Sequence, residues 1–169
     1  TYNFGGNQIF GAYAGIGHRE PNRTDLQYAD DPNELLAERM LDIEFNFRNS
    51  GERWIFDVNA YRQQYQNQLV LTGAIDAQNY PIRENVGQSF RQGLEFTGAY
   101  ELTSALSARA NLALSQNENV NWVSDPTSSF VGNTTIAFSP STVASARLTY
   151  VKKGFEATLW NQYVGKQYM

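Results

Sequence analysis

Apolar and polar residues alternate along long stretches of this chain, and this pattern restricts the possible folds more than any other feature. In residues 41–48, the odd positions hold leucine, isoleucine or phenylalanine, and the even positions hold charged or amide side chains. Successive side chains of a strand point to opposite faces, so period two predicts a sheet with one apolar and one polar face. Seven such segments are predicted as strands, within residues 8–19, 41–48, 54–65, 89–100, 106–116, 144–150 and 155–165.

The connections between these predicted strands alternate in length. Short turns follow the second, fourth and sixth strands, at residues 49–51, 101–104 and 152–154. Loops of about 20 residues follow the first, third and fifth strands, at residues 20–38, 66–88 and 117–141. The chain is therefore predicted to be all-β, an antiparallel up-and-down meander whose long loops all lie at one end.

The apolar face of such a sheet can be hidden in two ways. A soluble sandwich packs it against a second sheet, whereas an outer-membrane barrel turns it toward lipid. Strands of about ten residues, long loops at one end only and aromatic residues near strand ends favour the barrel. A soluble extracellular β-sandwich that binds carbohydrate or protein is the alternative, and an outer-membrane enzyme or simple porin is the third reading.

Composition excludes several other classes of protein. The 169 residues carry a net charge of −4 with acidic and basic residues mixed, so no nucleic-acid partner is expected. There is no cysteine and no run of about 18 apolar residues, which argues against disulfides, thiolate metal sites and a transmembrane helix. No signal peptide is recognisable, and both ends fall in strand-like sequence, so we expect a piece of a longer protein.

The end of the first predicted strand illustrates the barrel reading. A run of aromatic and small residues stops at Gly17 and is followed by His18, Arg19, Glu20 and Pro21. We interpret this point as the place where the strand leaves the bilayer on the long-loop side. Proline has no N–H to donate to a neighbouring strand and therefore ends the ladder.

Several segments, taken in order, resemble the later barrel strands of TonB-dependent outer-membrane receptors, with the closest likeness to the Bacteroidetes type. They are "YAGIGHREPNRTD", "LLAERMLDIEFNFR", "YRQQYQNQLVLTGAID", "IRENVGQSFRQGLEFTGAYEL" and "YVGKQY". The resemblance implies that residues 1–169 are a single segment of a 22-strand transmembrane β-barrel, with the plug and the other strands outside this chain. It also implies active uptake of a scarce ligand (a ferric siderophore, cobalamin or a glycan), with the plug, the TonB complex and outer-membrane lipid as partners.

Two groups of residues are candidates for function in such a receptor. Charged side chains on the polar face would line the lumen, and they are Asp42, Glu44, Asp57, Arg91, Glu95 and Arg109. Basic and aromatic residues of the long loops would contact the ligand, and they are Arg19, Arg23, Tyr28, Tyr80, Trp122 and Phe130.

Catalytic, metal and cofactor sites are not expected. His18 is the only histidine and is far short of a metal site. Residues 28–34 ("YADDPNE") contain acidic residues but lack the glycine and the ligand spacing of a calcium-binding loop. Glu44 and Asp57 could form a carboxylate pair, but any charged lumen offers such pairs. No phosphate-binding loop, nucleophile elbow or zinc-binding helix motif is present.

Overall fold

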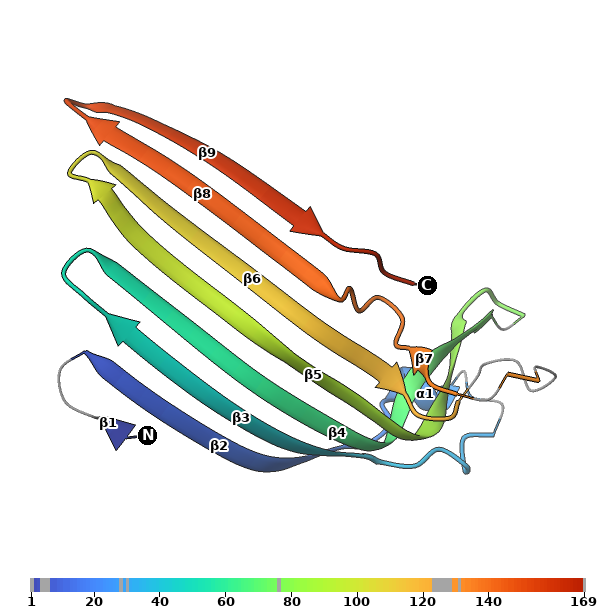
Figure 1. Cartoon of the computed structure of the whole chain (residues 1–169). Helices are drawn as coiled ribbons and strands as arrows, with labels where there is room; N and C mark the ends of the chain where they lie inside the picture. Colours follow the sequence, from blue (N-terminus) through green and yellow to red (C-terminus); the bar gives the residue numbers. More distant parts are fainter. Residues whose placement is uncertain are drawn as a thin grey trace.

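The described strands of the computed structural model form one antiparallel sheet (Figure 1). The structure describes residues 2–3, 7–27, 29, 31–75, 77–122, 129–130 and 132–168. The strands are β1 (Tyr2–Asn3), β2 (Gln8–Arg19), β3 (Glu38–Ser50), β4 (Trp54–Ile75), β5 (Pro81–Thr103), β6 (Leu106–Asn119), β7 (Thr134–Thr135), β8 (Thr142–Lys152) and β9 (Phe155–Val164). One short helix, α1 (Arg23–Gln27), lies between β2 and β3.

The order of the strands in the sheet follows the chain. Each long strand pairs with the next one along the sequence, and the two-residue β7 pairs beside β8 at the far end of β6. The predicted meander of about seven long strands is therefore confirmed. The sandwich alternative requires a second sheet to cover the apolar face, and all the described strands belong to one sheet. No helix in the described ranges is long and apolar enough to cross a membrane.

The register separates the two faces of the sheet as period two predicts. One row runs from Phe10 through Phe47, Val58, Phe96 and Leu112 to Ala144, each residue opposite the next on the neighbouring strand. We call this side the apolar face. The adjacent row on the other side, which we call the polar face, runs through Arg48, Asp57, Thr97, Asn111 and Ser145.

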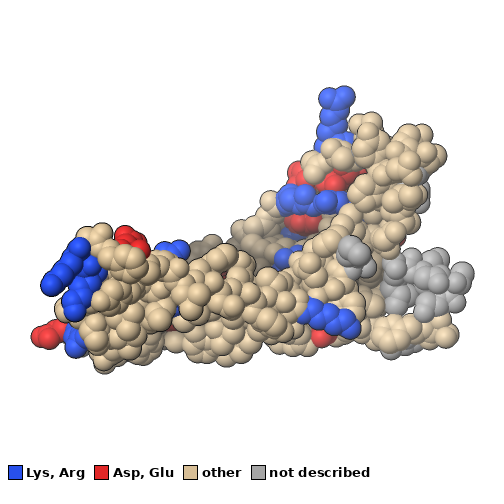
Figure 2. Space-filling model, turned by 90° about the horizontal axis from the view of Figure 1, so that it is seen from above, with Lys and Arg blue, Asp and Glu red and all other residues tan. Residues whose placement is uncertain are grey.

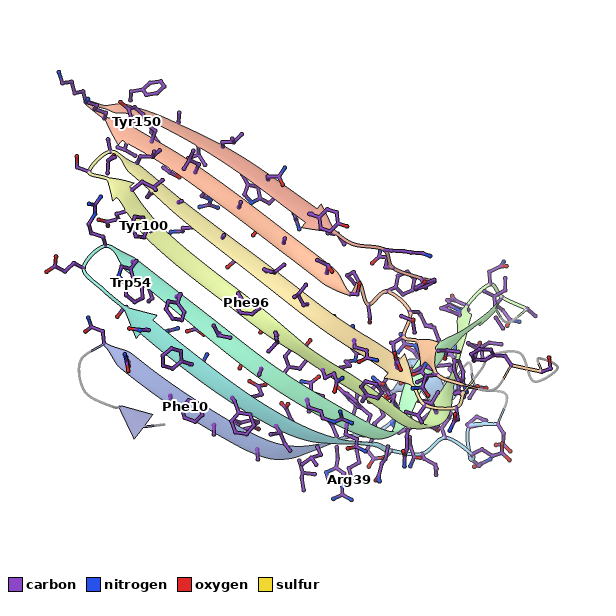
Figure 3. All side chains as sticks on the ribbon, viewed as in Figure 1. Phe10, Arg39, Trp54, Phe96, Tyr100 and Tyr150 are labelled. Carbon is purple, nitrogen blue, oxygen red and sulfur yellow. The ribbon has the colours of Figure 1, made fainter. Side chains whose placement is uncertain are left out.

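Large apolar side chains lie exposed along the apolar face instead of forming a core (Figure 3). Phe96 is 38% exposed, Tyr100 is 48% exposed and Leu159 is 71% exposed. An exposed apolar surface of this extent marks an interaction surface. Seen from above, the charged side chains gather toward the two ends of the molecule and leave an uncharged stretch between them (Figure 2).

The apolar face forms an oblique band across the strands. On β2 its side chains run from Phe10 to Ile16, and on β8 they run from Ala144 to Tyr150. Because Phe10 and Ala144 lie in the same row, both edges of the band shift by six residues over five strand-to-strand steps. With about 3.3 Å per residue and about 4.8 Å between strands, this shift corresponds to strands tilted by about 40°. Transmembrane barrels have the same strand tilt.

The hairpin of β4 and β5 extends beyond the other strands and corrects one prediction. Residues 66–88 were expected to form a long loop, but β4 continues to Ile75 and β5 begins at Pro81. The main buried hydrophobic residues lie at this end of the sheet, and they are Leu69, Val70, Val86 and Ile136. Leu69 and Val70 point to opposite faces of β4 and both are buried, so consecutive apolar residues occur here and the sequence does not alternate.

Gly93 allows β5 and β6 to approach closely on the polar face. A Cβ at this position would lie 2.5 Å from the carbonyl oxygen of Leu114 and 2.9 Å from the hydroxyl of Tyr61. We expect Gly93→Ala to lower the free energy of unfolding of the protein by about 1–3 kcal/mol, the usual cost of overpacking. Gly98→Ala, on the same strand, is the control, because a Cβ there would be 3.9 Å from its nearest neighbour. Urea unfolding of the protein measures both effects, and an equal loss of stability for the two variants would contradict the steric argument.

Candidate functional site at the long-loop end

A bidentate ion pair ties the end of β2 to the start of β3 on the polar face. Arg19 donates to both carboxylate oxygens of Glu38, from Nε at 3.0 Å and from Nη2 at 2.8 Å. Glu38 Oε1 also accepts the backbone N–H of Leu69 at 2.6 Å. Glu38 is 8% exposed, so these bonds satisfy a buried carboxylate and hold the extended part of β4 against β3.

Helix α1 is fixed beside this ion pair by its own cap. The backbone N–H of Asn22 donates to the carboxylate of Asp25, and the N–H of Asp25 donates to the side-chain oxygen of Asn22, both at 3.0 Å. This reciprocal arrangement is a capping box. Asp25 is 6% exposed and lies 3.8 Å from Arg19 and 3.7 Å from Arg83. The first long loop is thereby held over the polar face and linked to the β4–β5 hairpin.

Two further contacts bring the other loops onto the same hairpin. The amide of Asn85 accepts the N–H of Leu36 at 2.8 Å and donates to the carbonyls of Leu36 and Asn67. The indole N–H of Trp122 donates to Glu84 at 2.8 Å. The long-loop end is therefore an assembly organised around residues 67–88, and this end bends away from the plane of the sheet (Figures 1 and 2).

A cavity of about 270 Å³ lies between α1 and the tip of the hairpin. Its wall combines a carboxylate, a guanidinium, an aromatic ring and small polar side chains. These residues are Asn22, Thr24, Asp25, Tyr80, Pro81 and Arg83. Such a mixture of charged, aromatic and amide groups can bind a polar ligand by hydrogen bonds and ring contacts.

The polar face below this assembly carries the predicted wall residues. Asp42 and Arg91 lie in one row with Gln63 between them. Asp42 Oδ1 and Arg91 Nε are buried and have no hydrogen bond within the described part of the chain. Asp57 accepts a hydrogen bond from Arg48 Nε at 2.6 Å. The six predicted wall residues all fall on this face, where Glu44 and Glu95 line a hollow of about 400 Å³ with Arg91.

Two arginines face each other on the polar face near its short-turn end. Arg109 and Arg147 are directly opposed on β6 and β8, and both line a hollow that also contains Asp57. No ion pair joins either arginine to a carboxylate among the residues that the structure describes. Like charges in directly opposed positions repel, so this part of the wall favours an anionic partner.

The predicted loop residues do not gather into one site. Arg19 is engaged with Glu38 and Asp25, Tyr80 lines the cavity, and Trp122 is bonded to Glu84. Arg23 is the first residue of α1 and is exposed, and Phe130 is 53% exposed. Tyr28 lies outside the described residues.

Three residues that organise this end were missed from the sequence: Asp25, Glu38 and Asn85. For Asp25 a usable signal existed, since Asn22 and Asp25 have the spacing of a capping box. Glu38 and Asn85 had no comparable signal, because their partners lie 31 and 49 residues away in the sequence.

The sequence profile of a protein family described as "TonB dependent receptor-like, beta-barrel" matches residues 1–169, the whole chain. The chain belongs to the TonB-dependent receptor family. The resemblance seen in the sequence is thus confirmed, and the Bacteroidetes subtype stays a prediction. Proteins of this family are outer-membrane transport receptors and not enzymes, and the chain matches their β-barrel part.

Three solved structures share this fold. The copper transporter OprC has a TM-score of 0.73 and 17% identity, over 93% of this chain and 24% of that one. A variant of the ferric enterobactin receptor PfeA from Pseudomonas aeruginosa has a TM-score of 0.71 and 18% identity, over 97% and 27%. The iron transporter FrpB from Neisseria meningitidis has a TM-score of 0.67 and 17% identity, over 96% and 25%. The chain spans about a quarter of the length of these proteins. No curated protein matches it in sequence.

Proposed function

We propose that residues 1–169 form a single segment of the wall and extracellular loops of a 22-strand receptor that takes up a scarce ligand by TonB-dependent active transport. The ligand would be a ferric siderophore, cobalamin or a glycan. The observation that carries this proposal is the assembly of the long loops over the polar face, around the cavity that Asp25, Tyr80 and Arg83 line. A ligand captured there would lie at the outer end of the polar wall.

The side chains of the polar face support the proposal that a plug is the second partner. In a closed barrel, Asp42 and Arg91 would face the lumen, where a plug can supply the hydrogen bonds that their buried atoms lack within this segment. The opposed Arg109 and Arg147 would favour acidic plug side chains. The energy for displacing the plug would come from the TonB complex, which would contact parts of the receptor outside this chain.

The proposal is tested by uptake in a strain that lacks the receptor gene. We expect the strain to lose uptake of one of the three ligand classes, and expect the intact gene to restore it only when TonB is present. Uptake that continues without TonB would favour a porin, and uptake of all three classes without the gene would refute the proposal for this receptor.

A substitution in the cavity tests the site separately. We expect Tyr80→Ala to weaken ligand binding by about tenfold, because stacking on an aromatic ring contributes on the order of 1 kcal/mol or more. Phe155→Ala is the matched control, since Phe155 is exposed at the opposite, short-turn end of the sheet. Binding of the identified ligand to purified receptor is the measurement, and an equal loss for both variants would place the site elsewhere.

A further inference from the structure

The band on the apolar face ends at a polar residue on six successive long strands. Moving toward the long loops, the last apolar side chain is followed two residues later, on the same face, by a basic, amide or hydroxyl side chain. We call this row the outer polar belt, and it consists of His18, Arg39, Arg62, Gln92, Gln116 and Thr142. Figure 3 places Arg39 nearer to the long-loop end of the sheet than Phe10.

The outer polar belt lies at the level of a membrane surface. From β2 to β8 it follows the oblique upper edge of the band, so it stays near one level when the strands are tilted in the bilayer. The long loops of outer-membrane barrels are extracellular, which places the belt beside the head groups of the outer leaflet. Its side chains are on the outside of the wall, away from the lumen and from the loop assembly.

Basic residues occupy the belt on three adjacent strands. His18 and Arg39 are directly opposed on β2 and β3, and both are exposed. Neither side chain has a hydrogen bond or an ion pair with any residue in the described ranges. A histidine and an arginine side by side on the outside of the wall favour the binding of an anion that contacts both side chains.

Arg62 is held in place by partners that carry no charge. Its Nη1 donates to the amide oxygen of Gln92 at 2.6 Å, and Gln92 donates in turn to Gln116 at 2.9 Å. Its guanidinium carbon lies 5.2 Å from the centre of the Phe90 ring. These are neutral partners, so the orientation of Arg62 is restricted while its positive charge stays available. Next to the belt on β6, the carboxylate of Glu118 accepts hydrogen bonds from Gln116 and Asn133.

We propose that the basic part of the belt, His18 with Arg39 on β2 and β3 and Arg62 on β4, binds the phosphate groups of lipid head groups in the outer leaflet. This goes beyond ligand uptake and concerns the outside of the barrel. Guanidinium groups bind phosphate oxygens through paired hydrogen bonds. The acyl chains of the same lipid would lie on the band directly below, against Ile16, Leu41 and Ala60. Because the basic side chains border the lipid-facing surface, the phosphate of a phospholipid-type head group is favoured over a soluble anion.

Lipid binding to the complete receptor in a nonionic detergent tests this proposal. The probes are fluorescent phosphatidic acid and phosphatidylcholine with identical acyl chains. We expect the receptor to prefer phosphatidic acid, and expect the double variant Arg39→Gln/Arg62→Gln to bind it about 30-fold more weakly. This factor follows because each basic residue near an anionic lipid surface raises the binding affinity about fivefold, and the double variant loses two such residues. Binding of phosphatidylcholine should not change.

The control removes the same charge from the other face. Arg109→Gln/Arg147→Gln, on the polar face, should keep the preference for phosphatidic acid. If the first double variant fails to fold, as judged by its gel mobility before and after heating, Arg39→Gln alone should weaken binding about fivefold. Three results would each overturn the proposal. They are an equal loss of phosphatidic acid binding in the two double variants, no preference for phosphatidic acid in the unmodified receptor, and full competition by inorganic phosphate.

Discussion

Phe96→Arg is expected to destabilise the assembled barrel by about 2–4 kcal/mol, the cost of placing arginine near the middle of the lipid-facing surface. Phe96 lies within the apolar band on β5, opposite Val58 and Leu112. The guanidinium would replace a phenyl ring in contact with acyl chains, where no water solvates its charge. Refolding of the receptor into lipid vesicles and its unfolding in urea measure the effect.

Thr97→Arg provides a control only one residue away. Thr97 is on the polar face, opposite Asp57 and Asn111, so an arginine there meets water and a carboxylate. Its expected effect is below about 1 kcal/mol, in the range of cross-strand polar pairs. If the two variants were equally destabilised, the assignment of the apolar face to lipid would be wrong.

Glu38→Ala is expected to release the loop assembly while leaving the barrel strands folded. The change leaves the N–H of Leu69 without its acceptor and Arg19 without its bidentate partner. A buried donor without a partner costs about 1–3 kcal/mol, which corresponds to one to two orders of magnitude in local opening. Hydrogen exchange at the Leu69 amide should accelerate by this factor, and ligand binding in the adjoining cavity should weaken.

Two companion variants separate the hydrogen bonds from a general loss of charge. Glu38→Gln keeps an oxygen that can accept the Leu69 N–H, so its exchange should accelerate less than in Glu38→Ala. Glu44→Ala removes a carboxylate from the same face of β3, six residues away, and should leave the Leu69 amide unaffected. Unchanged exchange in Glu38→Ala would show that other contacts hold the hairpin in place.

The strands and the membership of the two faces were predictable because they depend on neighbouring residues only. Alternation in residues 41–48 and 106–116 places each side chain on a face before any partner is known. The six wall candidates, from Asp42 to Arg109, therefore lie on the polar face of the sheet, and their place in a lumen wall stays a prediction. The 66–88 segment was wrongly predicted as a loop, because its consecutive Leu69, Val70 and Leu71 do not alternate. That pattern results from burial by loops, which local sequence does not reveal.

The sequence alone thus determined an antiparallel meander of about seven long strands with one apolar face, because period two is a property of each strand by itself. Tertiary structure decided how far β4 and β5 extend, where α1 lies and which loop residues line the cavity. These features depend on contacts such as Glu38 with Leu69 and Leu36 with Asn85, between segments that are distant in the chain. The oblique course of the band also appears only after the strands are aligned, since register relates residues of different strands.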